Sequence, residues 1–238
     1  MRAARAIVMA AAVAALAMLV ASGPGTREGV WPWQTGLSLL RWATWVGLCA
    51  GAGALVLLLL AAIPRWRARW WIPAAALGIS IVAFAPPLLL LQQAKSVPPI
   101  HDITTDPFDP PDFVALLAER SKSPNGSKYG GTEIAAQQQK GYPDIKSLIV
   151  TSPPAEAVQK AIDAARSLGW EVVATDAPSG RIEATDTTRW FGFKDDVVIR
   201  VRAEGSGSRI DVRSVSRVGR SDVGANAARI RKFLGKLS

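Results

Sequence analysis

The sequence predicts an α+β protein in which three N-terminal transmembrane helices precede an antiparallel sheet that is covered on one face by two helices. Uncharged apolar stretches at about 6–23, 42–63 and 70–91 are each close to the roughly 20 residues that cross a hydrocarbon core. Further along, apolar residues alternate at strand spacing, and short loops join the later strands, which forces antiparallel pairing. The expected parts are a transmembrane region at 1–94, an irregular arm at 95–141 and a soluble α+β domain at 142–238.

Basic residues orient the three apolar stretches. Arg2 and Arg5 precede the first stretch, and Arg65, Arg67 and Arg69 fill the connection between the second and the third. Positive charge marks the cytoplasmic side of a membrane protein, so the chain after residue 91 is expected outside the cytoplasm. Seven of the nine tryptophans lie in the first 71 residues, near the ends of the stretches, where indole rings suit the headgroup level.

The first stretch also fits a cleavable secretory signal, because it is rich in alanine and ends in small residues. We favour a retained helix, since two further spans follow it. Cleavage would leave the outward placement of the soluble domain unchanged.

The net charge of +9 does not indicate nucleic-acid binding. The first 94 residues hold seven basic residues against one acid, as expected from their place at a membrane. Residues 189–236 hold 12 basic and five acidic residues, so one part of the soluble domain is basic. Outside the cytoplasm, the expected partners of such a surface are the lipid bilayer, with its anionic headgroups, or an envelope protein, and not nucleic acid.

The arm at 95–141 is rich in proline, which disfavours regular structure. Only 112–120 has the apolar spacing of a short helix, with Asp112 as its expected cap. We expect this segment to act as a connector, and residues 142–238 to fold without it.

In the last part, strands and helices follow one another with clear periodicity. Pro153 and Pro154 open a helix that Gly169 ends, and a last helix begins near Asp222. The strand candidates are 148–151, 170–175, 181–187, 197–203 and 209–216.

Two groups of residues are candidate binding sites. The first is an aromatic and charged run between two strands, which would form a recognition surface or else fold back over the core. It comprises Trp190, Phe191, Phe193, Lys194, Asp195 and Asp196. The second lies before the last helix and would hold a phosphate or carboxylate, or else supply an N-cap and ion pairs to Glu183 and Asp211. It comprises Arg213, Arg217, Arg220, Ser221 and Asp222.

No catalytic, metal or cofactor motif is found in the sequence. His101 is the only histidine and Cys49 the only cysteine, so neither a Ser–His–Asp triad with GxSxG spacing nor a cysteine-based metal site is indicated. We therefore expect no cofactor and no metal.

Four segments together resemble a bacterial protein family, the domain of unknown function 1499. They are Tyr142-Pro-Asp-Ile, Leu168-Gly-Trp, the run from Gly180 to Asp196 and the run from Ser208 to Arg231. The resemblance extends from about Pro98 to the C-terminus. It implies a bacterial protein, often membrane-associated, with no established activity. The order strand–helix–strand is also similar to helix-grip domains of envelope assembly lipoproteins, which carries a fold and no function.

These observations leave three functional hypotheses. The first is a non-enzymatic binding module in the periplasm, anchored in the inner membrane by several spans. The second is a hydrolase-like enzyme that uses carboxylates such as Asp186, Asp195 or Asp196. The third is a structural spacer in a membrane complex. Convergence of Asp195, Asp196 and the arginines of the last helix on one concavity would favour ligand binding or catalysis.

Overall fold

The computed structural model describes residues 1–67 and 69–238, which form two compact units. The first comprises Met1–Gln93 with Arg189–Gly192, and the second comprises Ala94–Thr188 with Phe193–Ser238. The helices of the first unit are α1 (Arg2–Arg27), α2 (Trp33–Leu60), the short 3-10 helix η1 (Pro64–Trp66) and α3 (Trp71–Ser96). All three α-helices are long and apolar enough to span a membrane, which confirms the three expected helices.

Small residues bring the three spans together. Ala12 of α1, Ala50 and Ala54 of α2 and Ala76 of α3 form one buried cluster. Such residues let helix backbones approach closely in a bilayer, where no hydrophobic effect drives helices together. Helix α2 begins at Trp33, nine residues before the expected start, because the helix continues beyond the uncharged window and includes Arg41.

The two basic clusters of the membrane part lie at the same end of the helical unit. Nη2 of Arg5 donates a hydrogen bond of 2.6 Å to the carbonyl oxygen of Trp66, in the connection between α2 and α3. The geometry therefore agrees with one basic side for the N-terminus and this connection.

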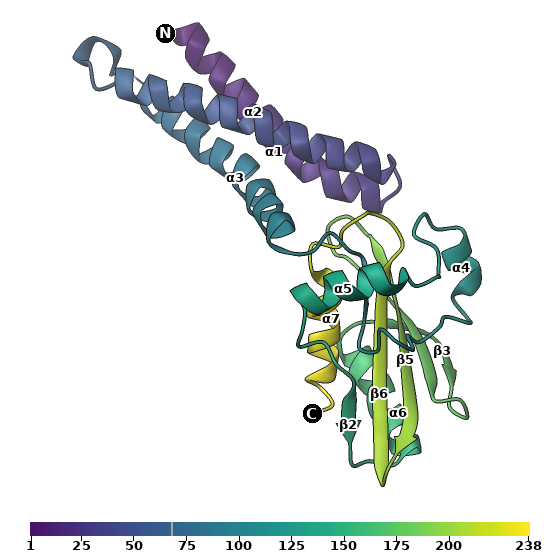
Figure 1. The fold of residues 1–238 in the computed structure, drawn as a ribbon. Coiled ribbons are helices and arrows are strands. Elements are labelled where there is room, and N and C mark those ends of the chain that lie inside the picture. Colours follow the sequence, from purple (N-terminus) through teal and green to yellow (C-terminus); the bar gives the residue numbers. More distant parts are fainter. Residues whose placement is uncertain (68) are drawn as a thin grey trace. The chain divides into compact units, whose positions relative to one another are not determined.

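The second unit is an antiparallel sheet with helices, as expected (Figure 1). The strand order is β1-β6-β5-β4-β3, and β2 also pairs with β6, beyond the end of β1. The strands are β1 (Asp102–Thr104), β2 (Leu148–Val150), β3 (Glu171–Asp176), β4 (Arg181–Thr187), β5 (Lys194–Glu204) and β6 (Gly207–Ser216). The helices are α4 (Leu117–Ser121), α5 (Gly131–Gly141), α6 (Pro154–Ser167) and α7 (Ala225–Leu234).

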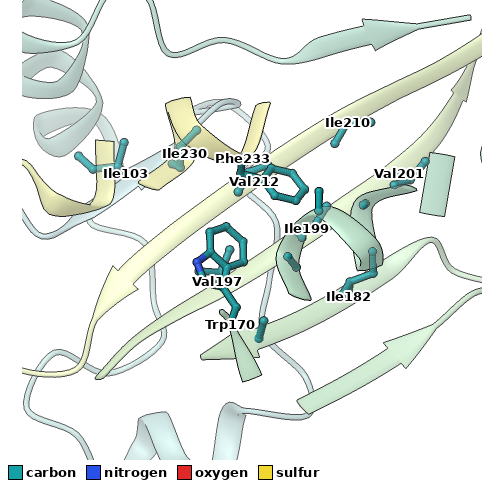
Figure 2. Close-up of a cluster of buried hydrophobic side chains, with 14 of the residues drawn as sticks. Ile103, Trp170, Ile182, Val197, Ile199, Val201, Ile210, Val212, Ile230 and Phe233 are labelled. Atoms are coloured by element: carbon teal, nitrogen blue, oxygen red, sulfur yellow. The ribbon is translucent and has the colours of Figure 1, made fainter. Parts of the chain in front are cut away.

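The main core lies between the sheet and the two helices α6 and α7. Figure 2 shows alternate residues of the central strands, such as Val197 and Ile199, on this face together with Ile230 of α7. Trp170 stacks on Phe233, with 5.3 Å between ring centroids. Apolar burial on this face is the main driving force for folding of the domain.

The opposite face of the sheet is covered as well, by residues 105–130, which we call the strap. Phe113 and Leu116 of the strap pack on Val198 and Val215, whose side chains lie on the face away from α6 and α7. Glu183 accepts hydrogen bonds from the backbone N–H groups of residues 114–116, at 2.8–3.0 Å, just before α4. In place of the expected cap Asp112, a side chain from the sheet holds this turn.

The segment 95–141 therefore differs from the irregular arm expected from its prolines. It contributes β1 to the sheet and the 11-residue helix α5, and it belongs to the same compact unit. Gln138 of α5 holds β1 in place: its Oε1 accepts from the N–H of Thr104, and its Nε2 donates to the carbonyl of Thr104. Because these partners lie far away in the sequence, local periodicity gave no sign of the arrangement.

Candidate functional site

Asp196 is a fully buried carboxylate beneath the strap. Its two oxygens accept hydrogen bonds from Nη1 of Arg120, from Nε and Nη2 of Arg217 and from the hydroxyl of Thr185, all at 2.8–2.9 Å. Burial lowers the pKa of Arg120, although Asp196 opposes the shift. The hydrogen-bonding capacity of this carboxylate is taken up by its partners, so it is closed to a substrate.

Asp195 lies on the other face of the sheet, beneath α7. Nη2 of Arg229 donates to Asp195 at 2.6 Å, and Nε of the same guanidinium donates to Asp186 at 2.8 Å. Nη1 of Arg229 also reaches Ser214 and Asn226. Neighbouring residues of a strand point to opposite faces, so Asp195 and Asp196 form two separate networks. The convergence that would have favoured catalysis is not present.

Arg213 is fully buried between the strap and β1. Its Nε and Nη2 donate to the two oxygens of Asp102 at 3.0 and 2.8 Å, and its guanidinium lies over the rings of Phe113 and Tyr129. Burial, together with the nearby charge of Asp102, raises the pKa of Tyr129 to about 12. Arg213 was expected in an anion site or paired with Glu183 or Asp211, but it joins β6 to β1 and the strap.

Asp222 and Ser221 bind backbone N–H groups at and just before the start of α7, whose N-cap residue is Gly224 and not the expected Ser221 or Asp222. Asp222 accepts hydrogen bonds from the N–H groups of Gly224 and Asn226, at 2.8 and 2.9 Å, at the start of α7. Ser221 accepts from the N–H of Val223 at 3.2 Å. Burial raises the pKa of Asp222, and these hydrogen bonds oppose the rise. The chain's own carboxylate therefore occupies this helix start.

Two exposed basic side chains of the candidate groups, Arg220 and Lys194, have no ion pair within the described ranges 1–67 and 69–238. Arg217 and Arg229, by contrast, are engaged by buried carboxylates. Within the two candidate groups, Arg220 and Lys194 are therefore the basic side chains available to an anionic headgroup.

The aromatic run is divided between the two compact units. Trp190 and Phe191 belong to the first unit, whereas Phe193 and the charged residues after it belong to the second. The backbone N–H of Phe193 donates to the hydroxyl of Thr188, which closes the connection between β4 and β5.

A groove of about 530 Å³ is present beside β2, at residues that the sequence did not single out. It lies between α5, the loop that follows β1, the loop before β2 and one residue of β6. Its lining residues are Thr105, Asp106, Pro107, Phe108, Ala135, Gln138, Gln139, Tyr142, Pro143, Ile145, Lys146, Ser147, Ile149 and Arg209.

Phe108 at this groove is 100% exposed, although its loop is firmly held. Asp106 accepts hydrogen bonds from the N–H groups of Phe108 and Asp109, and its other oxygen accepts from Arg209 at 2.6 Å. Pro107 further restricts the backbone. The sequence signal, which we missed, is an aromatic residue inside Asp-Pro-Phe-Asp-Pro-Pro, where neither a helix nor a strand can take its ring into a core.

The groove is edged by a charged network. Asp211 accepts from Arg200, Arg202 and Arg209 and from the hydroxyl of Ser147. Burial alone would raise the pKa of Asp211, but the hydrogen bonds of Ser147 and Arg200 and the charge of Arg209 bring it below its usual value. In the described part of the chain, no group of three His, Cys, Asp or Glu residues has the geometry of a metal site.

Residues 102–237 match the family described as a protein of unknown function, DUF1499. The match covers more than half of the chain and includes the whole sheet, the strap and α7. The chain belongs to this family. The DUF1499 match begins at the first residue of β1, which agrees with β1 and the strap being part of the domain and not a linker. No curated protein matches the chain.

Proposed function

We propose that this DUF1499 protein is a non-enzymatic interaction module of the bacterial cell envelope, anchored in the inner membrane with its α+β domain in the periplasm. The observation that carries the proposal is the groove beside β2, with Phe108 fully exposed on a loop that its own hydrogen bonds hold. An apolar side chain kept in water on a fixed backbone loses little entropy when a partner covers it, as in the anchors of protein interfaces.

The state of the buried carboxylates supports binding over catalysis. A general acid or base must reach its substrate within hydrogen-bond distance. Asp195 and Asp196, the strongest candidates for a hydrolase, are 3% and 0% exposed, and arginines hold both. A spacer subunit, the other alternative, would have no use for an exposed aromatic ring beside an open groove.

The periplasmic orientation is supported by the helical unit. Arg5 contacts the connection that holds Arg65 and Arg67, so the positively charged residues of both clusters lie at one end. Because positive charge is retained in the cytoplasm, three spans then leave the C-terminal domain outside.

Site-specific photo-crosslinking in native membranes tests the proposal. The photoreactive residue p-benzoylphenylalanine replaces Phe108 in one variant and Glu204, the exposed last residue of β5, in a control. We expect a discrete crosslinked band from position 108 that the control lacks. Equal patterns from both positions would contradict a binding role for the groove.

A further inference from the structure

The strand β2 leaves one edge without a strand partner. Among the described strands, β2 pairs only with β6, and Ile149 of β2, which is 57% exposed, lines the groove. Every second residue of an antiparallel strand turns its N–H and C=O away from the partner. The edge of β2 therefore offers backbone groups to a further strand.

The other exposed edges of the sheet are protected against such pairing. Gln138 occupies the backbone groups of Thr104, at the edge of β1. Strand β3, at the far side, carries a bulge between Val172 and Ala174 and charged residues at both ends, which disfavour pairing. Among these three edges, β2 is the one with neither a bulge nor a side chain bound to its backbone in the described part of the chain.

The charge of the groove favours an acidic partner. Asp106, the one acid in its lining, is neutralised by Arg209. Lys146 also lines the groove, is exposed and has no ion pair within the described part of the chain. A carboxylate placed near Lys146 would gain a complementary charge without competing against an existing pair.

We propose that the groove binds an extended, acidic segment of a partner protein, which adds a strand to the free edge of β2. An apolar side chain of the segment packs on Phe108 and Ile149, and an acidic side chain pairs with Lys146. This proposal rests on the proposed function of the groove and names the class of its ligand.

The probe for this test is a phage-displayed library of random linear nonapeptides, selected on the full-length protein in lipid nanodiscs. Enriched peptides are expected to carry Asp or Glu among alternating β-branched or aromatic residues. For a synthesised winner, measured by fluorescence anisotropy, Phe108→Ala should weaken binding about 30-fold or more, the loss typical of an anchor residue. Lys146→Glu should weaken binding about fivefold at low salt and less at high salt.

Matched controls are Val173→Ala, an exposed apolar residue on β3, and Lys232→Glu, an exposed lysine on α7, which should both leave binding unchanged. Because all four side chains are exposed, the variants should fold normally, which thermal unfolding verifies.

Backbone N-methylation of the peptide distinguishes strand addition from other modes of binding. Methylation should abolish binding at every second residue and be tolerated at the residues between them.

The outcomes separate the two proposals. Three results would each overturn the proposal that an acidic segment adds a strand to β2. They are peptide enrichment no greater than on the Phe108→Ala protein, equal peptide binding by Lys146→Glu, and an effect of N-methylation that does not alternate from residue to residue. A crosslink at position 108 in native membranes would leave the groove as a binding site in those cases. Absence of both the crosslink and the enrichment would overturn both proposals.

Discussion

Replacing Asp196 with Asn tests whether the buried carboxylates hold the fold. The substitution keeps the size of the side chain but removes the charge that Arg120 and Arg217 share. Both guanidiniums then lie in the domain without a counter-charge at this position. Breaking a buried ion pair by removing one partner costs about 3–5 kcal/mol. The retained amide oxygen still accepts one hydrogen bond, so we expect the lower end of that range.

For a domain of this size, each kcal/mol corresponds to about 2–4 °C in melting temperature. If Asp196→Asn lowers the free energy of unfolding by about 3 kcal/mol, the melting temperature should therefore fall by roughly 6–12 °C. The assay is amide hydrogen exchange of the β5 and β6 segments in the full-length protein, measured against temperature. These segments belong to the core of the domain, so the membrane helices do not dominate the signal.

Asp163→Asn is the matched control, because Asp163 lies exposed on α6 and, among the described residues, its side chain accepts a hydrogen bond only from Gln159 of the same helix. Its effect should stay within about 0.5 kcal/mol, as for most surface substitutions. A loss below about 1 kcal/mol for Asp196→Asn, smaller than a buried charge pair requires, would refute the structural role of this carboxylate.

Three further predictions concern acid stability, domain limits and processing. The pKa of Asp211 is lowered in the folded state, so its contribution to stability is present above its unfolded pKa of about 3.9 and is lost as pH falls through the folded value. In urea titrations, the stability gap between wild type and Asp211→Asn should therefore be constant above about pH 5 and shrink below about pH 4; a gap independent of pH would contradict this. A fragment of residues 94–238 should melt cooperatively by circular dichroism, whereas 142–238, which lacks β1, the strap and α5, should not; equal transitions would show that the strap is dispensable. Because Ala12 packs into the bundle and Arg5 holds Trp66, the protein purified from membranes should have the intact mass of the full chain, and a mass lacking the first 20 or so residues, the usual length of a signal peptide, would show cleavage.

Most regular elements could be predicted from the sequence, because their residues repeat at the period of the element. Strand β4 was expected at 181–187 and occupies Arg181–Thr187, where apolar and polar residues alternate. Helix α6 begins at Pro154, as its prolines indicate. The strap was missed because its stability comes from distant partners. Arg120 of the strap donates a hydrogen bond to Asp196, for example, and Glu183 accepts one from the backbone before α4.

The candidate site was the less predictable part. Asp195 and Asp196 were grouped because they are adjacent in sequence, yet the two-residue period of a strand already places their side chains on opposite faces. The groove could not be assembled in advance, since its lining comes from the loop after β1, from α5 and from β6. The one local signal in the sequence is the position of Phe108 between two Asp-Pro pairs, which predicts an exposed ring.

Occupation of the groove in the living cell is the most direct test of an envelope binding module. Gln139→Cys places a thiol in the groove and Glu204→Cys places one at the exposed end of β5, each in a Cys49→Ser background. A membrane-impermeant maleimide is applied to cells with a permeabilised outer membrane and, separately, to the purified protein. We predict that position 204 is labelled in both settings, whereas position 139 is labelled after purification and protected in cells. Equal labelling of position 139 in both settings would contradict an occupied groove, and absence of labelling at position 204 in cells would contradict the periplasmic domain.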